Sequence, residues 1–102
     1  MDRLETLKSL LAQNPQDSFL RYGLAMEYAR LNRLEESAEE FLTLLNSNPD
    51  YRPGYYQAAQ TLEKLGRVDE ARQMYQKGME VAARQGDAHT RSELQTALDL
   101  LD

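Results

Sequence analysis

The residue types that catalyse reactions are sparse in this 102-residue chain, and their spacing does not assemble a reaction centre. The single histidine, His89, falls in the first turn of the last expected helix, where we interpret it as a solvated surface residue. Glu35, Glu36, Glu39 and Glu40 could bind a divalent cation through carboxylate oxygens, but they also fit a solvated helix face whose first acids favour the helix N-terminus. With no glycine-rich phosphate loop or nucleophile elbow, we expect no enzyme, catalytic residue, cofactor or metal site.

Two tyrosines and two methionines could instead form a stacking surface for a base or a cofactor. The spacing directs Tyr55 and Met74 toward helix contacts, where aromatic and thioether side chains fill gaps, so we predict that they belong to the core. The other tyrosine and the other methionine of this possible surface are Tyr56 and Met79. Gly78 lies inside an expected helix, where glycine costs about 1 kcal/mol relative to alanine. It either lets another helix approach or is an indifferent surface glycine.

Composition and length restrict the class of protein. A chain of this length forms one domain with a sizeable core, and it has no cysteine to form a disulfide or a thiolate metal site. The net charge is −5 and the twelve basic residues are scattered, which disfavours nucleic acid as a partner. The first residues lack the apolar run of a signal peptide, and no window has the length and apolarity of a membrane span. We therefore expect a cytoplasmic protein with no nucleic-acid or membrane partner.

An internal repeat is the strongest pattern in the chain. The segment from Asn14 to Asp50 is echoed 34 residues later by Asn48 to Gly86. The paired positions keep their residue or its physical type: Asn14-Pro15 with Asn48-Pro49, Tyr22 with Tyr56, Ala25 with Ala59, Leu31 with Leu65, Arg33 with Arg67, Glu36 with Glu70, and Phe41 with Tyr75. Such a period indicates stacked units, none of which can bury its apolar face alone.

Helical spacing of apolar residues predicts six helices and no strand. We expect them at about residues 2–13, 18–31, 34–47, 52–65 and 68–85, with the sixth capped by Asp87. Leu24, Ala25, Tyr28 and Leu31 would face the partner of the second helix, and Leu94, Ala97, Leu98 and Leu101 would form the stripe of the sixth. Asn32 and Gly66 occupy the tight turns where a positive φ is needed, and Gly86 ends the fifth helix.

These residues resemble the tetratricopeptide repeat. The first copy supplies the slots of that motif with Arg21, Leu24-Ala25, Tyr28, Ser37, Phe41 and Pro49, and the second with Tyr55, Ala58-Ala59, Leu62, Ala71 and Tyr75. Arg21, Ser37, Gly78 and Ala83 depart from the pattern. The resemblance implies an all-α fold, a short right-handed α-solenoid of helical hairpins. Its expected divisions are an N-terminal helix in 1–14, repeats in 15–51 and 52–86, and a capping helix in 87–102.

A second apolar line on the second helix predicts a binding groove. Phe19, Tyr22, Met26 and Ala29 form this line, and the resemblance implies that it faces the concave side of the stack. Pro53, Tyr56, Gln60, Glu63 and Lys64 would continue it on the fourth helix, and His89, Ser92, Thr96 and Asp99 on the sixth. The predicted partner-binding residues are Phe19, Tyr22, Met26, Arg30, Tyr56, Gln60, Glu63 and Lys64. The alternative is that the first helix covers Phe19 and Tyr22 as ordinary core.

The predicted function is a non-enzymatic interaction module that binds a peptide or helix of a partner protein, with an affinity on the order of micromolar. The clamp that binds chaperone tails in this family is not matched, because Tyr22, Met26 and Gln57 stand in its slots. The alternative function is weak self-association through Leu10 or Leu100, leucines that a single helix stripe does not need. The sequence does not identify the partner.

Overall fold

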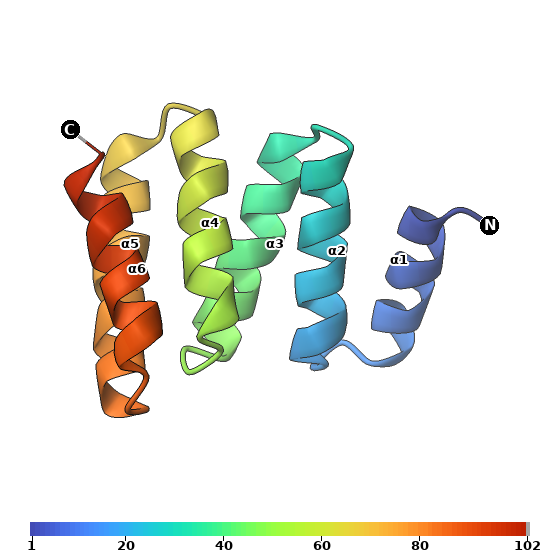
Figure 1. The fold of residues 1–102 in the computed structure, drawn as a ribbon. Helices are drawn as coiled ribbons and strands as arrows, with labels where there is room; N and C mark the ends of the chain where they lie inside the picture. The colour runs from blue at the N-terminus through green and yellow to red at the C-terminus, as the bar shows by residue number, and fades with distance from the viewer. Residues whose placement is uncertain (102) are drawn as a thin grey trace.

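Six α-helices form the computed structural model, which describes residues 1–101 and has no strand within them (Figure 1). They are α1 (Arg3–Gln13), α2 (Ser18–Arg30), α3 (Leu34–Ser47), α4 (Pro53–Lys64), α5 (Val68–Arg84) and α6 (Ala88–Asp99). Each expected helix boundary lies within one residue of the observed one. The last expected unit, 87–102, ends at Asp102, which lies outside the described residues.

Aspartates begin three of these helices. The side chains of Asp2, Asp17 and Asp87 each accept a hydrogen bond from the backbone N–H three residues later, at 2.8, 3.0 and 3.0 Å. Each bond satisfies one of the N–H groups that the first helical turn leaves without a partner. The hydrogen bond from the Thr90 hydroxyl, together with the one from its backbone N–H, also lowers the pKa of Asp87. The cap predicted at Asp87 is confirmed.

The tight turns between paired helices have the predicted backbone conformation. Asn32 joins α2 to α3 with a φ of 61°, and Gly66 joins α4 to α5 with a φ of 77°. Gly86 ends α5 with a φ of 71°. Asparagine and glycine adopt this left-handed region most readily, so the two copies of the repeat reach the same turn with different residues.

The helices stack in sequence and form two layers. Figure 1 shows α2, α4 and α6 on the near side, α3 and α5 behind them, and α1 at the N-terminal end of the row. The main core runs from Ala25 on α2 to Leu94 on α6, and it includes Tyr55 and Met74 as predicted. A smaller cluster of Leu4, Leu11, Leu24 and Tyr28 holds α1 against α2. None of the described helices has the length and apolarity to cross a membrane.

Small side chains allow the close approach of the helices. Ala25, Ser37, Ala59 and Ala71 are completely buried at the contacts within the two hairpins. The departure from the motif at Ser37 is accommodated because its hydroxyl donates a 2.8 Å hydrogen bond to the carbonyl of Ala25. The departure at Arg21 is accommodated in another way, since its guanidinium extends to Glu40 on α3 at 2.6 Å.

Gly78 marks a second close approach. A Cβ at this position would lie 2.7 Å from Cβ of Tyr55, closer than side chains tolerate. It would also lie 3.0 Å from Cδ1 of Leu94, a tight contact that requires the leucine to shift. Of the two interpretations left open by the sequence, the structure therefore supports the close approach: α4 and α6 both contact α5 at this glycine.

One prediction about the core is wrong. Leu31 was expected to pack on the partner of α2, but its side chain is 41% exposed. It is the residue that directly follows α2, whereas its equivalent Leu65, directly after α4, packs partly buried against the main core. The predicted stripe of α6 holds better, because Leu94 is buried and Ala97, Leu98 and Leu101 pack partly buried against the main core.

Candidate binding surface on the inner face

The inner face is the name we give to the layer of α2, α4 and α6 (Figure 1). The predicted binding residues come from two of these helices, Phe19, Tyr22, Met26 and Arg30 from α2 and Tyr56, Gln60, Glu63 and Lys64 from α4. Their exposure differs greatly. The structure therefore separates the residues that a partner could contact from those that mainly support the fold.

Phe19 is mostly exposed, whereas Tyr22 is partly covered by two other aromatic rings. The Phe19 side chain is 74% exposed, so the alternative in which α1 buries it is wrong. The ring of Tyr22 lies 6.0 Å from that of Phe41 and 5.6 Å from that of Tyr51, measured between centroids. Burial, followed by the proximity of Tyr51, raises the pKa of Tyr22. Tyr22 is thus half-buried by its own repeat and by the loop before α4, and Met26, like Tyr22, packs partly buried against the main core.

A hydrogen-bonded group lies on the inner face of α4. The hydroxyl of the buried Tyr75, on α5, donates to the carboxylate of Glu63, and Nε2 of Gln60 lies 2.6 Å from the same hydroxyl. Burial raises the pKa of Tyr75, and its hydrogen bond to Glu63 raises it further. The ring of Tyr56 meets that of Tyr75 edge to face at 6.3 Å and remains 39% exposed. Three predicted residues are therefore fixed through one core tyrosine.

Two adjoining hollows lie between α4 and α6. The first has a volume of about 440 Å³ and is lined by Tyr56, Gln60 and Glu63 from α4 and by His89, Ser92 and Thr96 from α6. The second, of about 430 Å³, is lined by Arg52, Pro53, Gln57 and Thr90, among others. Tyr56 and Glu93 line both. The hollows therefore form a trough along the inner face, large enough for side chains of a bound peptide.

Three of the four residues that we expect on this face of α6 line a hollow. His89, Ser92 and Thr96 line the first hollow, whereas Asp99 does not and accepts a hydrogen bond from Gln95 at 2.8 Å. Glu93, which the sequence analysis did not select, lines both hollows. It lies one helical turn after His89, so the i, i+4 spacing could have placed it on this face.

Leu100 also lines the first hollow, and its side chain is 80% exposed. The sequence analysis assigned it to self-association instead. Lys64 is exposed at the end of α4 and does not line either hollow.

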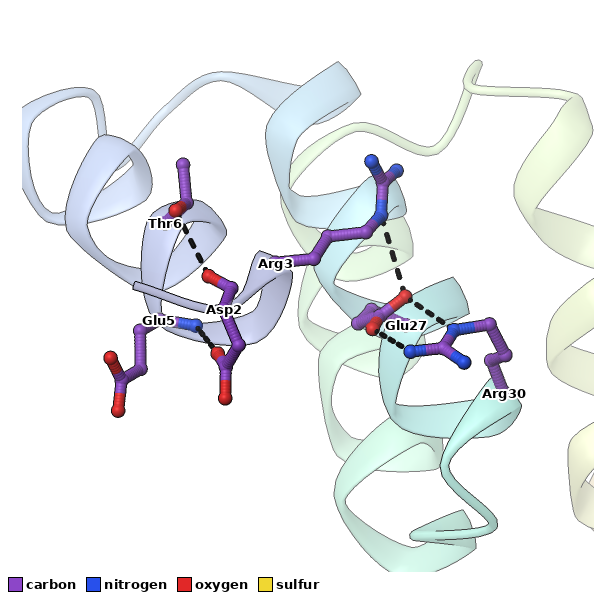
Figure 2. Close-up of polar contacts among 6 residues, drawn as sticks. All are labelled: Asp2, Arg3, Glu5, Thr6, Glu27 and Arg30. Atoms are coloured by element: carbon purple, nitrogen blue, oxygen red, sulfur yellow. Dashed lines mark hydrogen bonds and ion pairs between the residues drawn. The ribbon is translucent and has the colours of Figure 1, made fainter.

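Arg30 is engaged by a buried acid that the sequence did not reveal (Figure 2). Glu27 is only 4% exposed, and its carboxylate accepts two hydrogen bonds from the Arg30 guanidinium at 2.9 and 2.6 Å. Arg3 reaches it from α1, with Nε 3.4 Å from Oε1. The hydrogen bonds from Arg30 hold the pKa of Glu27 below its ordinary range, against the effect of burial. The ion pair between Arg3 and Glu27 joins α1 to α2.

Three of the four acids in the cluster of α3 pair with arginines. Glu36 pairs with Arg33 at 2.6 Å, and Glu40 pairs with Arg21 at the same distance. Glu35 lies 3.5 Å from Arg67, which also pairs with Glu70 in the second repeat. These acids thus serve as partners of separate arginines, in agreement with the interpretation of a helix face.

Comparison with known proteins gives consistent matches. A family model described as "Tetratricopeptide repeat" matches residues 1–98. The TPR repeat-containing protein PA0015 of Pseudomonas aeruginosa is 28% identical over 99 residues, which are 97% of this chain and 94% of that protein. The solution structure of a tetratricopeptide repeat domain protein from Salinibacter ruber is 35% identical, with a TM-score of 0.81, over 86% of this chain and 89% of that one.

A more distant structure contains a bound partner. PcrH, solved in complex with the chaperone binding region of PopD, superimposes with a TM-score of 0.88 over 96% of this chain and 74% of that one. The two chains are 16% identical, so this likeness shows the fold alone.

Proposed function

The chain belongs to the tetratricopeptide repeat family, and we propose that it binds a peptide segment or a helix of a partner protein on its inner face. The observation that carries this proposal is the trough between α4 and α6, where the half-exposed Tyr56 stands beside Gln60, Ser92 and Thr96. Amphipathic aromatic side chains at the edge of a hollow favour contacts with proteins. PcrH, which has the same fold, was solved with a segment of its partner, and this supports the proposal.

The proposed binding residues remain the eight predicted from the sequence, but their roles differ. Tyr56, Gln60 and Glu63 line the first hollow, and Phe19 offers an exposed aromatic ring at the other end of the inner face. Tyr22, Met26, Arg30 and Lys64 complete the surface around them. The division into repeats at 15–51 and 52–86, with end units 1–14 and 87–102, is part of the same proposal. So are the cytoplasmic location and the absence of an enzymatic activity.

The test is affinity capture from native lysate with a variant that fills the trough. Thr96 is exposed on α6 and lines the first hollow, so Thr96→Arg occupies the hollow without disturbing the core. The matched control is Gln73→Arg, which places the same side chain at an exposed position of α5. We expect a partner that the wild type and the control capture and that Thr96→Arg loses. Equal capture by all three proteins, each folded by circular dichroism, would refute binding in the trough.

Self-association is a second candidate function. Leu100 is 80% exposed and Leu10 is 41% exposed, and they lie on the terminal helices or directly after them. An exposed leucine at each end of a stack could join two copies of the chain. Light scattering over a range of concentrations would show a mass that rises for the wild type and not for Leu100→Ser. A constant monomer mass would remove this function.

A further inference from the structure

We propose that the first hollow between α4 and α6 binds a basic side chain, arginine or lysine, of the partner segment. This inference rests on the proposed function and specifies the chemistry of the ligand. It follows from the two carboxylates that face the hollow, from the hydrogen bonds that hold the carboxylate of Glu63 in place, and from the apolar atoms around them.

Glu63 presents an available carboxylate oxygen at this hollow. The hydrogen bonds from the Tyr75 hydroxyl and from Gln60 both go to Oε2. Within residues 1–101, Oε1 receives no hydrogen bond from the protein. A carboxylate that is held in place by a core residue loses little freedom when a cation binds it.

The hydrogen bond from Tyr75 persists at neutral pH. Tyr75 is completely buried, and burial together with the neighbouring Glu63 carboxylate raises the pKa of its hydroxyl. The hydroxyl therefore keeps its proton and continues to donate to Glu63. This keeps Oε2 occupied, so that Oε1 is the oxygen available to a ligand.

The opposite wall of the hollow is also acidic. Glu93 on α6 lines both hollows, and its side chain is 58% exposed. On the same helix, Nε2 of His89 lies 3.5 Å from Oε1 of Glu93. A cation in the first hollow would lie between carboxylates from two helices, an arrangement that favours a guanidinium or an ammonium group.

Among residues 1–101, no arginine or lysine forms an ion pair with Glu63 or Glu93. The first hollow has no arginine or lysine in its described lining. Arg52 lines the second hollow, but its Nε pairs with Asp87 at 3.0 Å and its Nη1 lies 2.6 Å from Oε1 of Gln85. The hollow thus keeps a negative charge. This charge would repel an acidic peptide and attract a basic one.

The apolar part of the hollow suits the stem of a long basic side chain. Tyr56 is half-exposed, and Ala97 and Leu100 complete the lining on α6. Arginine and lysine carry methylene groups that pack on apolar surface while the charged end reaches a polar partner, and an aromatic face attracts the cation. A volume of about 440 Å³ accommodates such a side chain.

The test is an NMR titration of the isotope-labelled protein with three short blocked peptides. Each has a central residue between two leucines, and that residue is arginine, glutamate or norleucine. We expect the arginine peptide to shift the amide resonances of Tyr56, Gln60, Ser92 and Thr96 to saturation. The glutamate and norleucine peptides should bind about threefold to tenfold more weakly.

Two variants assign the effect to the acids. Glu63→Gln keeps an acceptor for Tyr75 but removes the charge. It should weaken the binding of the arginine peptide about threefold to tenfold. Glu93→Gln lies at an exposed position and gives a second measurement that does not depend on the network of Tyr75. The matched control is Glu80→Gln, which removes the same charge from an exposed position of α5 and should leave the affinity unchanged.

The inference and the proposed function fail separately. If the norleucine or glutamate peptide binds the hollow as tightly as the arginine peptide, the basic ligand is wrong and the binding role remains. If the two hollow variants bind the arginine peptide as the wild type does, the assignment to Glu63 and Glu93 is wrong. If no peptide shifts these resonances, the inference is overturned, and the capture experiment with Thr96→Arg decides the proposed function.

Discussion

The hydroxyl of Ser37 donates a 2.8 Å hydrogen bond to the backbone carbonyl of Ala25, and both residues are fully buried between α2 and α3. A serine in the slot that the repeat motif gives to alanine is thus compatible with close packing, because its polar atom has a partner. Its equivalent in the second hairpin is Ala71, which is also fully buried. The second hairpin therefore buries this position completely without such a hydrogen bond.

Ser37→Ala should therefore be tolerated, and Ser37→Leu should not. Alanine loses one hydrogen bond, worth about 0.5–1.5 kcal/mol of unfolding free energy, whereas leucine overpacks the contact and costs about 1–3 kcal/mol or more. Urea denaturation followed by circular dichroism measures both. A leucine variant as stable as the wild type would show that the helices separate easily.

Gly78→Ala should destabilise the protein even though alanine favours helices. The new methyl group would lie 2.7 Å from Cβ of Tyr55, so the cost of displacing α4 should exceed the gain of about 1 kcal/mol in helix propensity. The matched control is Gly23→Ala in α2, whose Cβ would meet Leu7 at an ordinary 3.4 Å. We expect the control to be neutral or up to about 1 kcal/mol more stable. If both variants gain stability, the close approach at Gly78 does not constrain the fold.

The turn at Gly66 should accept asparagine but not valine. Gly66 has a φ of 77°, a conformation that its equivalent Asn32 adopts at 61°. Gly66→Asn copies the first repeat and should change the unfolding free energy little, while Gly66→Val should cost about 1–2 kcal/mol or more because of its branched Cβ. Thermal melts of the two variants test this. Equal melting temperatures would contradict the role of the left-handed turn.

The ion pair at Glu27 predicts a pH dependence of stability. Hydrogen bonds from Arg30 keep the pKa of Glu27 in the folded protein below its ordinary value of 4.5, so at acidic pH the unfolded chain binds more protons. The resulting stabilisation is present above about pH 4.5 and declines as the pH falls toward the pKa of the folded state.

The wild type should therefore be more stable than Glu27→Gln at pH 7, and the difference should narrow as the pH falls below about 4.5. Denaturation curves collected across this range measure the two free energies. A difference that is constant with pH would show that the charge of Glu27 does not stabilise the contact between α1 and α2.

Much of the fold could be predicted from local patterns. The boundaries of the six helices follow from the spacing of apolar residues, from caps such as Asp17 and Asp87, and from the prolines that follow α1 and α3. The positive φ of Asn32 and Gly66 follows from the same short-range chemistry. Leu31 differs from the prediction because its burial depends on which other helices pack around the end of α2, and the spacing within its own helix does not encode that packing.

The candidate site was less accessible to prediction. Helical spacing placed Phe19, Tyr22 and Tyr56 on one face, but it could not show that Tyr51 covers Tyr22 and that Phe19 stays exposed. Nor could it show that the buried Tyr75 would fix Glu63 at the edge of a hollow. Each of these relationships depends on parts of the chain outside the helix that carries the residue.

The sequence by itself determined the repeat, the six helices, their turns and the family to which the chain belongs, because these depend on interactions between residues close along the chain. Only the tertiary structure decided which inner-face residues are exposed, where the trough lies, and that Glu27 is buried between two arginines. Exposure and charge pairing depend on the distances between α1, α2, α4, α5 and α6. Those distances are set by packing at residues such as Gly78, whose effect appears only when the helices are assembled.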